Sequence, residues 1–118
     1  MNKKTYLLMV FLLVLFSNPL FAQTQLEMNQ TAQINYKKAD KELNKVYALL
    51  MKSLDKTEAQ LLITAQKNWI RFRDSHCQFD SHPYEGGSMQ PLVYATCLEE
   101  ITKKRIAELK ENIKSKKN

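Results

Sequence analysis

Hydrophobic residues recur at every third or fourth position along most of this chain of 118 residues. A polar stretch at 23–30 lacks this period, and we expect the first helix to begin between Asn29 and Ile34, with Asn29 or Thr31 as its N-cap. The apolar positions that follow keep the helical spacing: Tyr36, Ala39, Leu43, Val46, Tyr47, Leu50 and Leu54. This pattern predicts an amphipathic helix with a lysine-rich outer face.

A second amphipathic segment follows a short turn at 55–57. Thr57 and Gln60 have the spacing of a capping box, which predicts a helix from Glu58 to about Phe79. The residues expected to face the core are four, three and four positions apart, with Trp69 as the core anchor: Ala65, Trp69, Phe72 and His76. Because the connection is short, we expect the first two helices to be antiparallel neighbours.

A loop at 80–90 contains both glycines and precedes Pro91, which suits the first turn of a helix because its missing N–H is not needed there. The third helix then carries Tyr94, Cys97, Leu98, Ile101, Ile106, Leu109 and Ile113. We expect it to end after Ile113 in a lysine-rich tail. The sequence therefore predicts an all-α fold, a small three-helix antiparallel bundle with its core at about 36–109 and a basic C-terminal tail at 110–118.

The N-terminal residues have the features of a secretory signal peptide. Lys3 and Lys4 precede an apolar run at 6–16, and a helix-breaking segment ends in Ala22. The run is shorter than the roughly 20 residues of a transmembrane helix. We predict a signal peptide at 1–22, a single domain at 23–118 and a periplasmic or secreted location. After cleavage we expect no stable membrane insertion.

Export bears on the two cysteines, Cys77 and Cys97. An even number of cysteines in an oxidising compartment favours a disulfide. Closing a loop of this length contributes about 3 kcal/mol in the chain-entropy model, which is a large fraction of the stability of so small a domain. We therefore expect a Cys77–Cys97 disulfide between the second and third helices.

The chain offers little for catalysis. His76 is adjacent to Cys77, but neighbouring residues on a helix point about 100° apart, and a disulfide removes the thiol. The candidate metal ligands match no closed tetrahedral site: Asp74, His76, Asp80, His82 and Glu85. The common motifs of hydrolases, metalloproteases and phosphate-binding loops are absent from the sequence. We expect no catalytic residue, metal or cofactor, and no enzyme activity.

Basic residues outnumber acidic ones by 18 to 12. Removal of residues 1–22 takes away two lysines and no acid, which leaves 16 basic and 12 acidic residues. Residues 103–118 contain seven basic and two acidic side chains, an arrangement that suits the dipole at the end of a helix. The plain interpretation is a solvated face, and the alternative is a surface for an acidic partner. We expect no nucleic-acid partner.

Several polar side chains flank the apolar faces of the three helices. An unsatisfied buried polar group costs about 1–3 kcal/mol, so these residues should find partners: Asp40, Asn44, Gln66, Arg73, Asp74 and Arg105. Pairing of Asp40 with Arg73, or of Asp74 with Arg105, would fix the register of the helices. Direct contact with a ligand is the alternative role.

A set of residues spread over 36–109 resembles the LprI-like family of small exported bacterial proteins, named for a lysozyme inhibitor. The set is Tyr36, Ala39, Asp40, Glu42, Leu43, Asn44, Tyr47, Ala65, Gln66, Trp69, Ile70, Phe72, Arg73, Asp74, Cys77, Cys97, Thr102, Arg105 and Leu109. Its most specific part is a Gln-x-x-Trp followed by Arg-Asp and, three residues later, a cysteine. The resemblance implies a helical, disulfide-bonded envelope protein that binds another protein, which is lysozyme for at least one type of member.

The loop at 80–90 is the segment with room to bind such a partner. Typical lysozymes are strongly basic, so an inhibitor with a positive net charge needs a local acidic patch. The loop region supplies one: Asp80, Glu85, Glu99 and Glu100. Our hypothesis is that Tyr84 and Glu85 enter the lysozyme cleft while His82 meets its carboxylates. The alternative is a structural or accessory module of the cell envelope that docks through its basic C-terminal helix. The sequence sets no oligomeric state.

Overall fold

The computed structural model describes residues 2–5, 9 and 19–117, without the side chains of 19–23. Three long helices make up the domain: α2 (Pro19–Met51), α3 (Lys56–Ser81) and α4 (Gln90–Lys117). A short 3-10 helix, η1 (His82–Tyr84), follows α3, and no strand occurs among the described residues. The predicted all-α fold, three helices joined by one disulfide, is confirmed.

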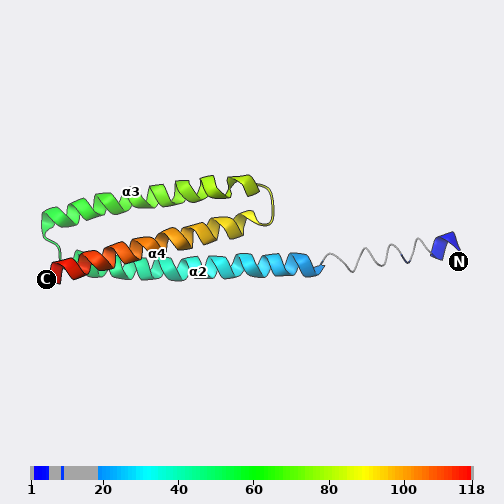
Figure 1. Ribbon diagram of the computed structural model, residues 1–118, viewed down its shortest axis with the longest axis horizontal. Coiled ribbons are helices and arrows are strands. Elements are labelled where there is room, and N and C mark those ends of the chain that lie inside the picture. The colour runs from blue at the N-terminus through cyan, green and yellow to red at the C-terminus, as the bar shows by residue number, and fades with distance from the viewer. Residues whose placement is uncertain (1, 6–8, 10–18, 118) are drawn as a thin grey trace.

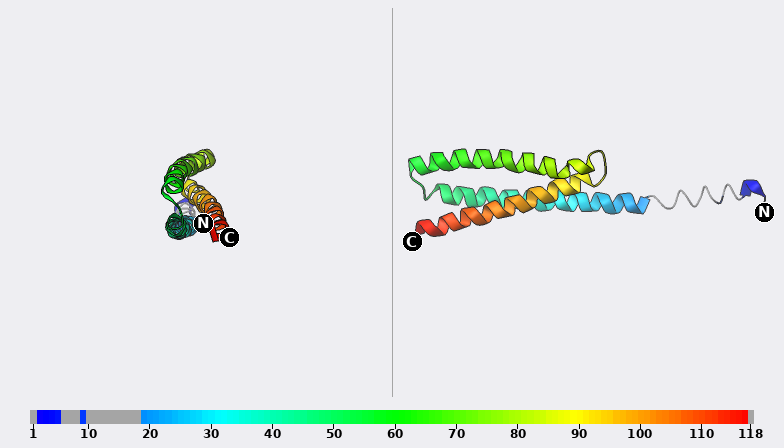
Figure 2. Two further views of the ribbon diagram at one scale, coloured as in Figure 1. Left: turned by 90° about the vertical axis from the view of Figure 1, so that its left-hand side faces the viewer. Right: turned by 45° about the horizontal axis from the view of Figure 1, so that its top comes forward.

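The helix α4 packs along α2, and α3 lies against α4 on the other side (Figures 1 and 2). The short turn makes α2 and α3 antiparallel as predicted. Their backbones hardly approach each other, and they contact one another through side chains: Leu62 and Trp69 of α3 pack on the cluster that contains Leu43 of α2. Both helices pack on α4, and long side chains bridge the distance between α2 and α3.

The main core lies between α2 and α4. Its buried residues are Leu43, Val46, Leu50, Ile106 and Leu109. Tyr47, Leu54, Leu62, Trp69 and Ile113 pack around this cluster. Burial of each large aliphatic side chain contributes about 1.5–3 kcal/mol, so this cluster supplies much of the stability of the domain.

The helix α2 begins at Pro19, well before the expected start between Asn29 and Ile34. The early turns pack on the beginning of α4, where Asn29 Nδ2 donates a hydrogen bond of 2.9 Å to the carbonyl of Ser88. Ala32 is buried in this region. The polar residues before Ile34 include good helix formers, and a distant part of the chain supplies their packing.

The predicted signal peptide lies largely outside the described residues. Positions 1, 6–8 and 10–18 are not described, and 19–22 form the first turn of α2. No described helix is long and apolar enough to cross a membrane.

The helix α3 begins two residues earlier than predicted. Asp55 is its N-cap: the Asp55 Oδ1 atom accepts a hydrogen bond of 2.8 Å from the backbone N–H of Glu58. In return, the Asp55 N–H donates to Glu58 Oε2 over 3.1 Å. The capping box is therefore formed by Asp55 and Glu58, and the prediction of Thr57 and Gln60 is wrong.

The helix α4 continues to Lys117, beyond the predicted end at Ile113. Its last turn is rich in lysine, which the negative end of the helix dipole favours. The basic segment is thus part of the helix through Lys117.

Candidate functional site

The helix α3 turns a polar face toward the rest of the domain. Its buried residues are Gln66, Arg73, Cys77 and Ser81. The predicted core face of this helix is wrong at Ala65 and Phe72, which are exposed, whereas Trp69 is half-buried and packs on the main core, and His76 is half-buried. Phe72 precedes Cys77 by five residues, which places it about 140° away around the helix. Because Cys77 faces α4, Phe72 faces solvent.

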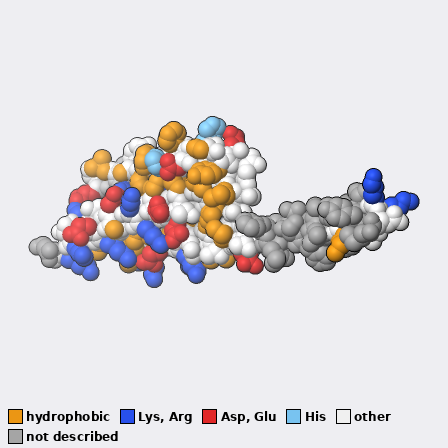
Figure 3. Space-filling model, turned by 45° about the vertical axis from the view of Figure 1, so that its right-hand side comes forward, with side chains coloured by type: hydrophobic (Ala, Val, Ile, Leu, Met, Phe, Trp, Pro, Cys, Tyr) orange, Lys and Arg blue, Asp and Glu red, His pale blue; other side chains and the backbone are white. Residues whose placement is uncertain are grey.

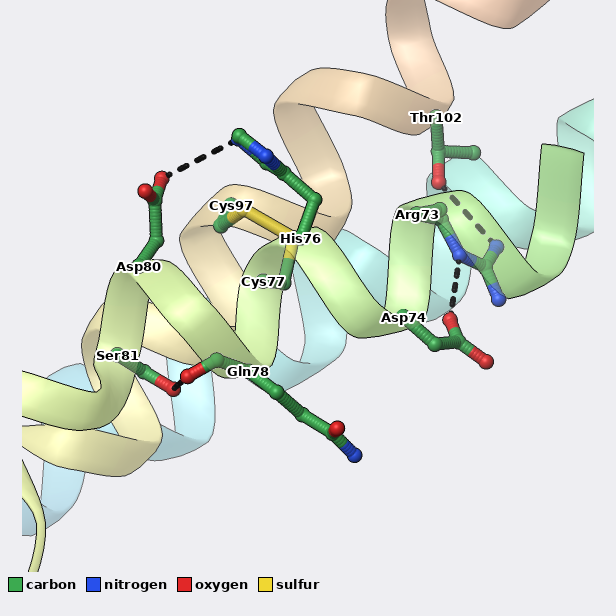
Figure 4. The surroundings of a disulfide bond; sticks show 9 residues. All are labelled: Arg73, Asp74, His76, Cys77, Gln78, Asp80, Ser81, Cys97 and Thr102. Carbon is green, nitrogen blue, oxygen red and sulfur yellow. Dashed lines mark hydrogen bonds and ion pairs between the residues drawn. A yellow bond between two sulfur atoms is a disulfide. The ribbon is translucent and has the colours of Figure 1, made fainter.

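A buried disulfide joins α3 to α4 (Figure 4). Cys77 and Cys97 have Cα atoms 5.6 Å apart, and their side chains are 0% and 8% exposed. They form a second apolar cluster with Leu98, against which Tyr36 and Tyr94 pack. The predicted Cys77–Cys97 pairing is confirmed. The bond attaches α3 to α4, and α3 itself contributes no fully buried leucine or phenylalanine to this contact.

One turn before Cys77, Arg73 connects all three helices. Its guanidinium lies 5.4 Å from the ring centroid of Tyr36 on α2 and 5.2 Å from that of Trp69 on α3. Arg73 Nη1 is 3.2 Å from Asp40 Oδ1 on α2 and 3.4 Å from the Thr102 hydroxyl oxygen on α4. The side chain thus fills the space between the helices and satisfies its charge there.

Asp74 completes the surroundings of Arg73. Arg73 Nε donates to Asp74 Oδ1 over 2.9 Å. Burial alone would lower the pKa of Arg73, but the hydrogen bonds to Asp74 and Asp40 outweigh it, and the pKa is raised. Burial also raises the pKa of Tyr36, against the opposing charge of Arg73. Arg73 is therefore a fixed cation at neutral pH.

A second guanidinium, that of Arg105 on α4, also contacts the ring of Trp69. The guanidinium of Arg105 is 5.8 Å from the Trp69 ring, and Arg105 Nε donates to Gln66 Oε1 over 3.0 Å. Arg105 pairs with Glu108 at 2.8 Å, whereas the alternative pairing with Asp74 is not formed. Asn44 is exposed and lies outside this polar network, contrary to expectation.

Two members of the polar network were not predicted, Tyr36 and Thr102. Tyr36 was assigned to the apolar face of the first helix, where its ring in fact packs against a cation. Thr102 lies at helical spacing in the buried row Leu98, Thr102, Ile106 and Leu109, and it is fully buried. A buried threonine needs a hydrogen-bond partner. The position of Thr102 in this row could therefore have predicted that it belongs to the polar network.

His76 and Asp80 lie beside the disulfide, with His76 Nε2 3.6 Å from Asp80 Oδ2 (Figure 4). Together with the Cys97 sulfur they form the one group of three potential metal ligands in the described part of the chain. The sulfur is bonded to Cys77, so this group offers two ligands at most. Typical zinc sites take three or four protein ligands, and the geometry does not favour a metal here.

The loop after α3 presents the predicted partner-binding residues to solvent. Tyr84 is 43% exposed, and the exposed His82 and Glu85 form an ion pair with Nδ1 and Oε2 3.1 Å apart. Gly86 has a φ of 79°, which favours glycine at this turn. An open pocket of about 450 Å³ adjoins the loop, lined by Gln78, Ser81, His82, Glu85, Gln90, Pro91 and Tyr94. His82 and Glu85 are thus accessible but compensate each other's charge when His82 is protonated.

The basic end of α4 is largely neutralised by carboxylates. Five of its seven cations lie within ion-pair distance of an acid: Lys103 with Glu99, Arg105 with Glu108, Lys110 with Glu42, Lys114 with Glu111 and Lys116 with Glu58. This pairing does not favour docking of the segment on an anionic surface. The alternative function proposed from the sequence therefore gains no support from the geometry.

The outer side of α3 carries a row of exposed apolar side chains, which we call the α3 ridge: Leu61, Ala65, Phe72 and Phe79. The three large residues are 67%, 58% and 76% exposed, and the row keeps steps of four, seven and seven residues. Phe72 stacks on His76 with ring centroids 5.5 Å apart. The face shown in Figure 3 carries hydrophobic side chains along its upper edge, near the histidines, and lysines and arginines along its lower edge.

Comparison with known proteins identifies the family. A family model described as lysozyme inhibitor LprI matches residues 18–109. An uncharacterized protein of Rhizobium meliloti (strain 1021) is 37% identical over 110 residues, which cover 82% of this chain and 79% of that protein. No solved structure matches the chain significantly. The matched range contains both cysteines and the whole of the polar network around Arg73. The chain therefore belongs to the LprI family, whose model is described as a lysozyme inhibitor.

Proposed function

We propose that this chain is an exported, non-catalytic binding protein that inhibits lysozyme. The observation that carries the proposal is the family match across residues 18–109, which spans α2, α3, the disulfide and most of α4. The family description names an inhibitor of an enzyme rather than an enzyme. An inhibitor needs a rigid surface and no reacting group of its own, in keeping with a small stapled bundle.

Two features support export to the periplasm or the medium. Residues 1–22 have the charge and hydrophobicity pattern of a signal peptide. The disulfide between Cys77 and Cys97 is buried between α3 and α4, toward the loop that joins them, and such bonds persist in oxidising compartments.

The role proposed for the polar network is to hold α3, not to bind a ligand. Arg73 is only 6% exposed, and its donors are directed at Asp40, Asp74 and Thr102. A partner would have to displace one of these groups to reach the guanidinium. The network therefore fixes the position of the helix from which the loop at 82–85 projects.

The loop residues His82, Tyr84 and Glu85 remain the proposed partner-binding group. Their exposure supports this role, since a half-exposed tyrosine on a short, anchored loop gives contact area at small entropic cost. By occupying the cleft, the loop would compete with the polysaccharide substrate.

The test is a muramidase assay with purified, oxidised residues 23–118. Saturable inhibition at micromolar concentration is expected, together with its loss in the double variant Tyr84→Ala/Glu85→Ala. The matched control is Gln30→Ala/Gln33→Ala, at exposed positions of α2 that should not matter. Absence of inhibition by the unmodified protein would remove lysozyme as the target and leave the family assignment intact.

A further inference from the structure

The α3 ridge has an apolar surface that the fold does not use. Single exposed leucines or phenylalanines are ordinary on a protein surface, but three in one row on one helix mark an interaction site more specifically. The opposite face of α3 is held by the disulfide and by Arg73, so the outward aromatic residues contribute little to packing.

One flank of the α3 ridge carries an uncompensated positive charge. Arg71 is exposed about 100° around the helix from Phe72, and it forms no ion pair with a carboxylate in the described part of the chain. The carboxylates of α3 itself do have partners: Glu58 pairs with Lys116, Asp74 with Arg73 and Asp80 with His76. The ridge therefore combines apolar side chains with one neighbouring cation that is free to meet an acidic group.

We propose that the α3 ridge, with Arg71 on its flank, binds in the substrate cleft of a muramidase. This inference rests on the proposed function and names a surface for it in addition to the loop. Retaining glycosidases of this kind carry two carboxyl groups about 5–5.5 Å apart in a concave site. An arginine with several donors in a planar fork can meet such a pair, and Arg71 is the exposed arginine on the flank of the ridge.

Shape and charge are both compatible with this occupant. The helix α3 lies on the outer side of α4 (Figures 1 and 2), and Leu61, Phe72 and Phe79 are 67%, 58% and 76% exposed on it, so the ridge can enter a groove of a partner. From Leu61 to Phe79 it extends about 27 Å at 1.5 Å per residue, the scale of an extended cleft. On the face shown in Figure 3, lysines and arginines gather along the lower edge and hydrophobic side chains along the upper edge, so a basic enzyme meets less repulsion at an apolar surface of this molecule than at its lysine-rich side.

Substitutions on two helices separate this proposal from a general effect of hydrophobicity. Phe72→Ser/Phe79→Ser removes the aromatic part of the ridge. Ile34→Ser/Leu49→Ser makes the matched change at residues of α2 that are 53% and 52% exposed. Circular dichroism and the urea midpoint establish that both proteins are folded. We expect at least a tenfold higher Kd for a muramidase in the ridge variant and less than a twofold change in the control.

The charged flank and the cleft are tested in the same binding assay. Arg71→Glu should weaken binding at least tenfold, Arg71→Lys should weaken it less, and a chitin oligosaccharide that fills the cleft should displace the inhibitor. If the unmodified protein inhibits but the ridge and Arg71 variants bind equally well, the ridge assignment is wrong while the proposed function stands. If the protein inhibits but the oligosaccharide fails to compete, both the ridge and the loop at 82–85 are wrongly placed in the cleft, while inhibition of lysozyme stands. If the unmodified protein binds no muramidase, the ridge assignment and the proposed function are both wrong.

Discussion

The guanidinium of Arg73 lies 5.2 Å from the ring centroid of Trp69. Both residues are on α3, and the same guanidinium also contacts Asp40 on α2 and Thr102 on α4. The guanidinium of Arg105 on α4 lies 5.8 Å from the same ring, so the only tryptophan of the sequence has two cation–π contacts. Cation–π contacts gain strength when they are shielded from water. Trp69 also packs on the main core, so the two cation contacts add to its apolar packing, whereas Phe72 is 58% exposed and does not provide the packing expected of it.

Removal of the Arg73 guanidinium should destabilise the domain. Arg73→Ala leaves the buried hydroxyl of Thr102 without this partner and opens space beside Trp69. Asp40 and Asp74 are partly exposed, and water can solvate them, so we expect a loss of about 2–3 kcal/mol rather than the larger cost of a fully buried pair.

Urea unfolding of the oxidised protein measures this loss, and Arg73→Lys should recover part of it because the charge remains while the planar fork is lost. At this chain length a loss of 1 kcal/mol lowers the Tm by about 4–8 °C. A variant Arg73→Ala with an unchanged midpoint but without lysozyme inhibition would contradict the structural role and indicate direct ligand contact.

Loss of the disulfide should have an effect of similar size. Cys77→Ala/Cys97→Ala should lower the free energy of unfolding by about 3 kcal/mol, because the unfolded chain regains the freedom of the closed loop. The bond also holds α3, whose buried residues are otherwise polar. Thermal unfolding of this variant, compared with the oxidised parent in the presence and absence of reductant, gives the measurement. Equal midpoints for all three would show that the bond does not stabilise the domain.

The sequence predicted the three helices, the disulfide and the contact between Asp40 and Arg73 because each depends on local spacing or on a simple pairing rule. It did not predict the rotation of α3. Counting apolar residues favours a core face through Trp69 and Phe72. Had the inward direction of Cys77 been applied first, Phe79 would have been placed about 160° from it, on the outside.

The beginning of α2 could not be predicted from local signals. Residues 23–30 are polar and lack periodicity, and their helix is supported by the start of α4, as in the contact of Asn29 with Ser88, 59 positions along the chain. Such support depends on tertiary packing, which overrides local propensity. The partner of Asp74 was predicted wrongly as Arg105. Arg73, the residue next to Asp74, forms ion pairs with both Asp74 and Asp40.

The main core gives a prediction with an internal control on one helix. Leu43 is 2% exposed and Leu49 is 52% exposed, both on α2. Leu43→Ala should cost about 2–5 kcal/mol because it leaves a cavity between α2 and α4, whereas Leu49→Ala should change stability by no more than about 0.5 kcal/mol. Urea midpoints of the two variants test this. Equal losses would mean that the packing of α2 against α4 differs from that described.

Acid should remove one specific contribution to stability, at the start of α3. The hydrogen bond from Lys116, together with that from the backbone N–H of Asp55, lowers the pKa of Glu58 below its ordinary value of 4.5. A carboxyl group with a lowered folded-state pKa stabilises the protein above its unfolded pKa, and this contribution is lost as the pH falls through the folded value. Glu58→Gln keeps an acceptor for the capping box but removes the charge.

The parent should therefore be more stable than Glu58→Gln at pH 7, and the difference should shrink as the pH falls below 4.5. Urea unfolding of both proteins at several pH values from 7 to about 2.5 measures it, with the range set by the lowered pKa. Glu100→Gln is the control, since Glu100 is exposed and pairs with no cation among the described residues. A difference that stays constant across this range would show that the carboxylate charge of Glu58 is not what joins α3 to the end of α4.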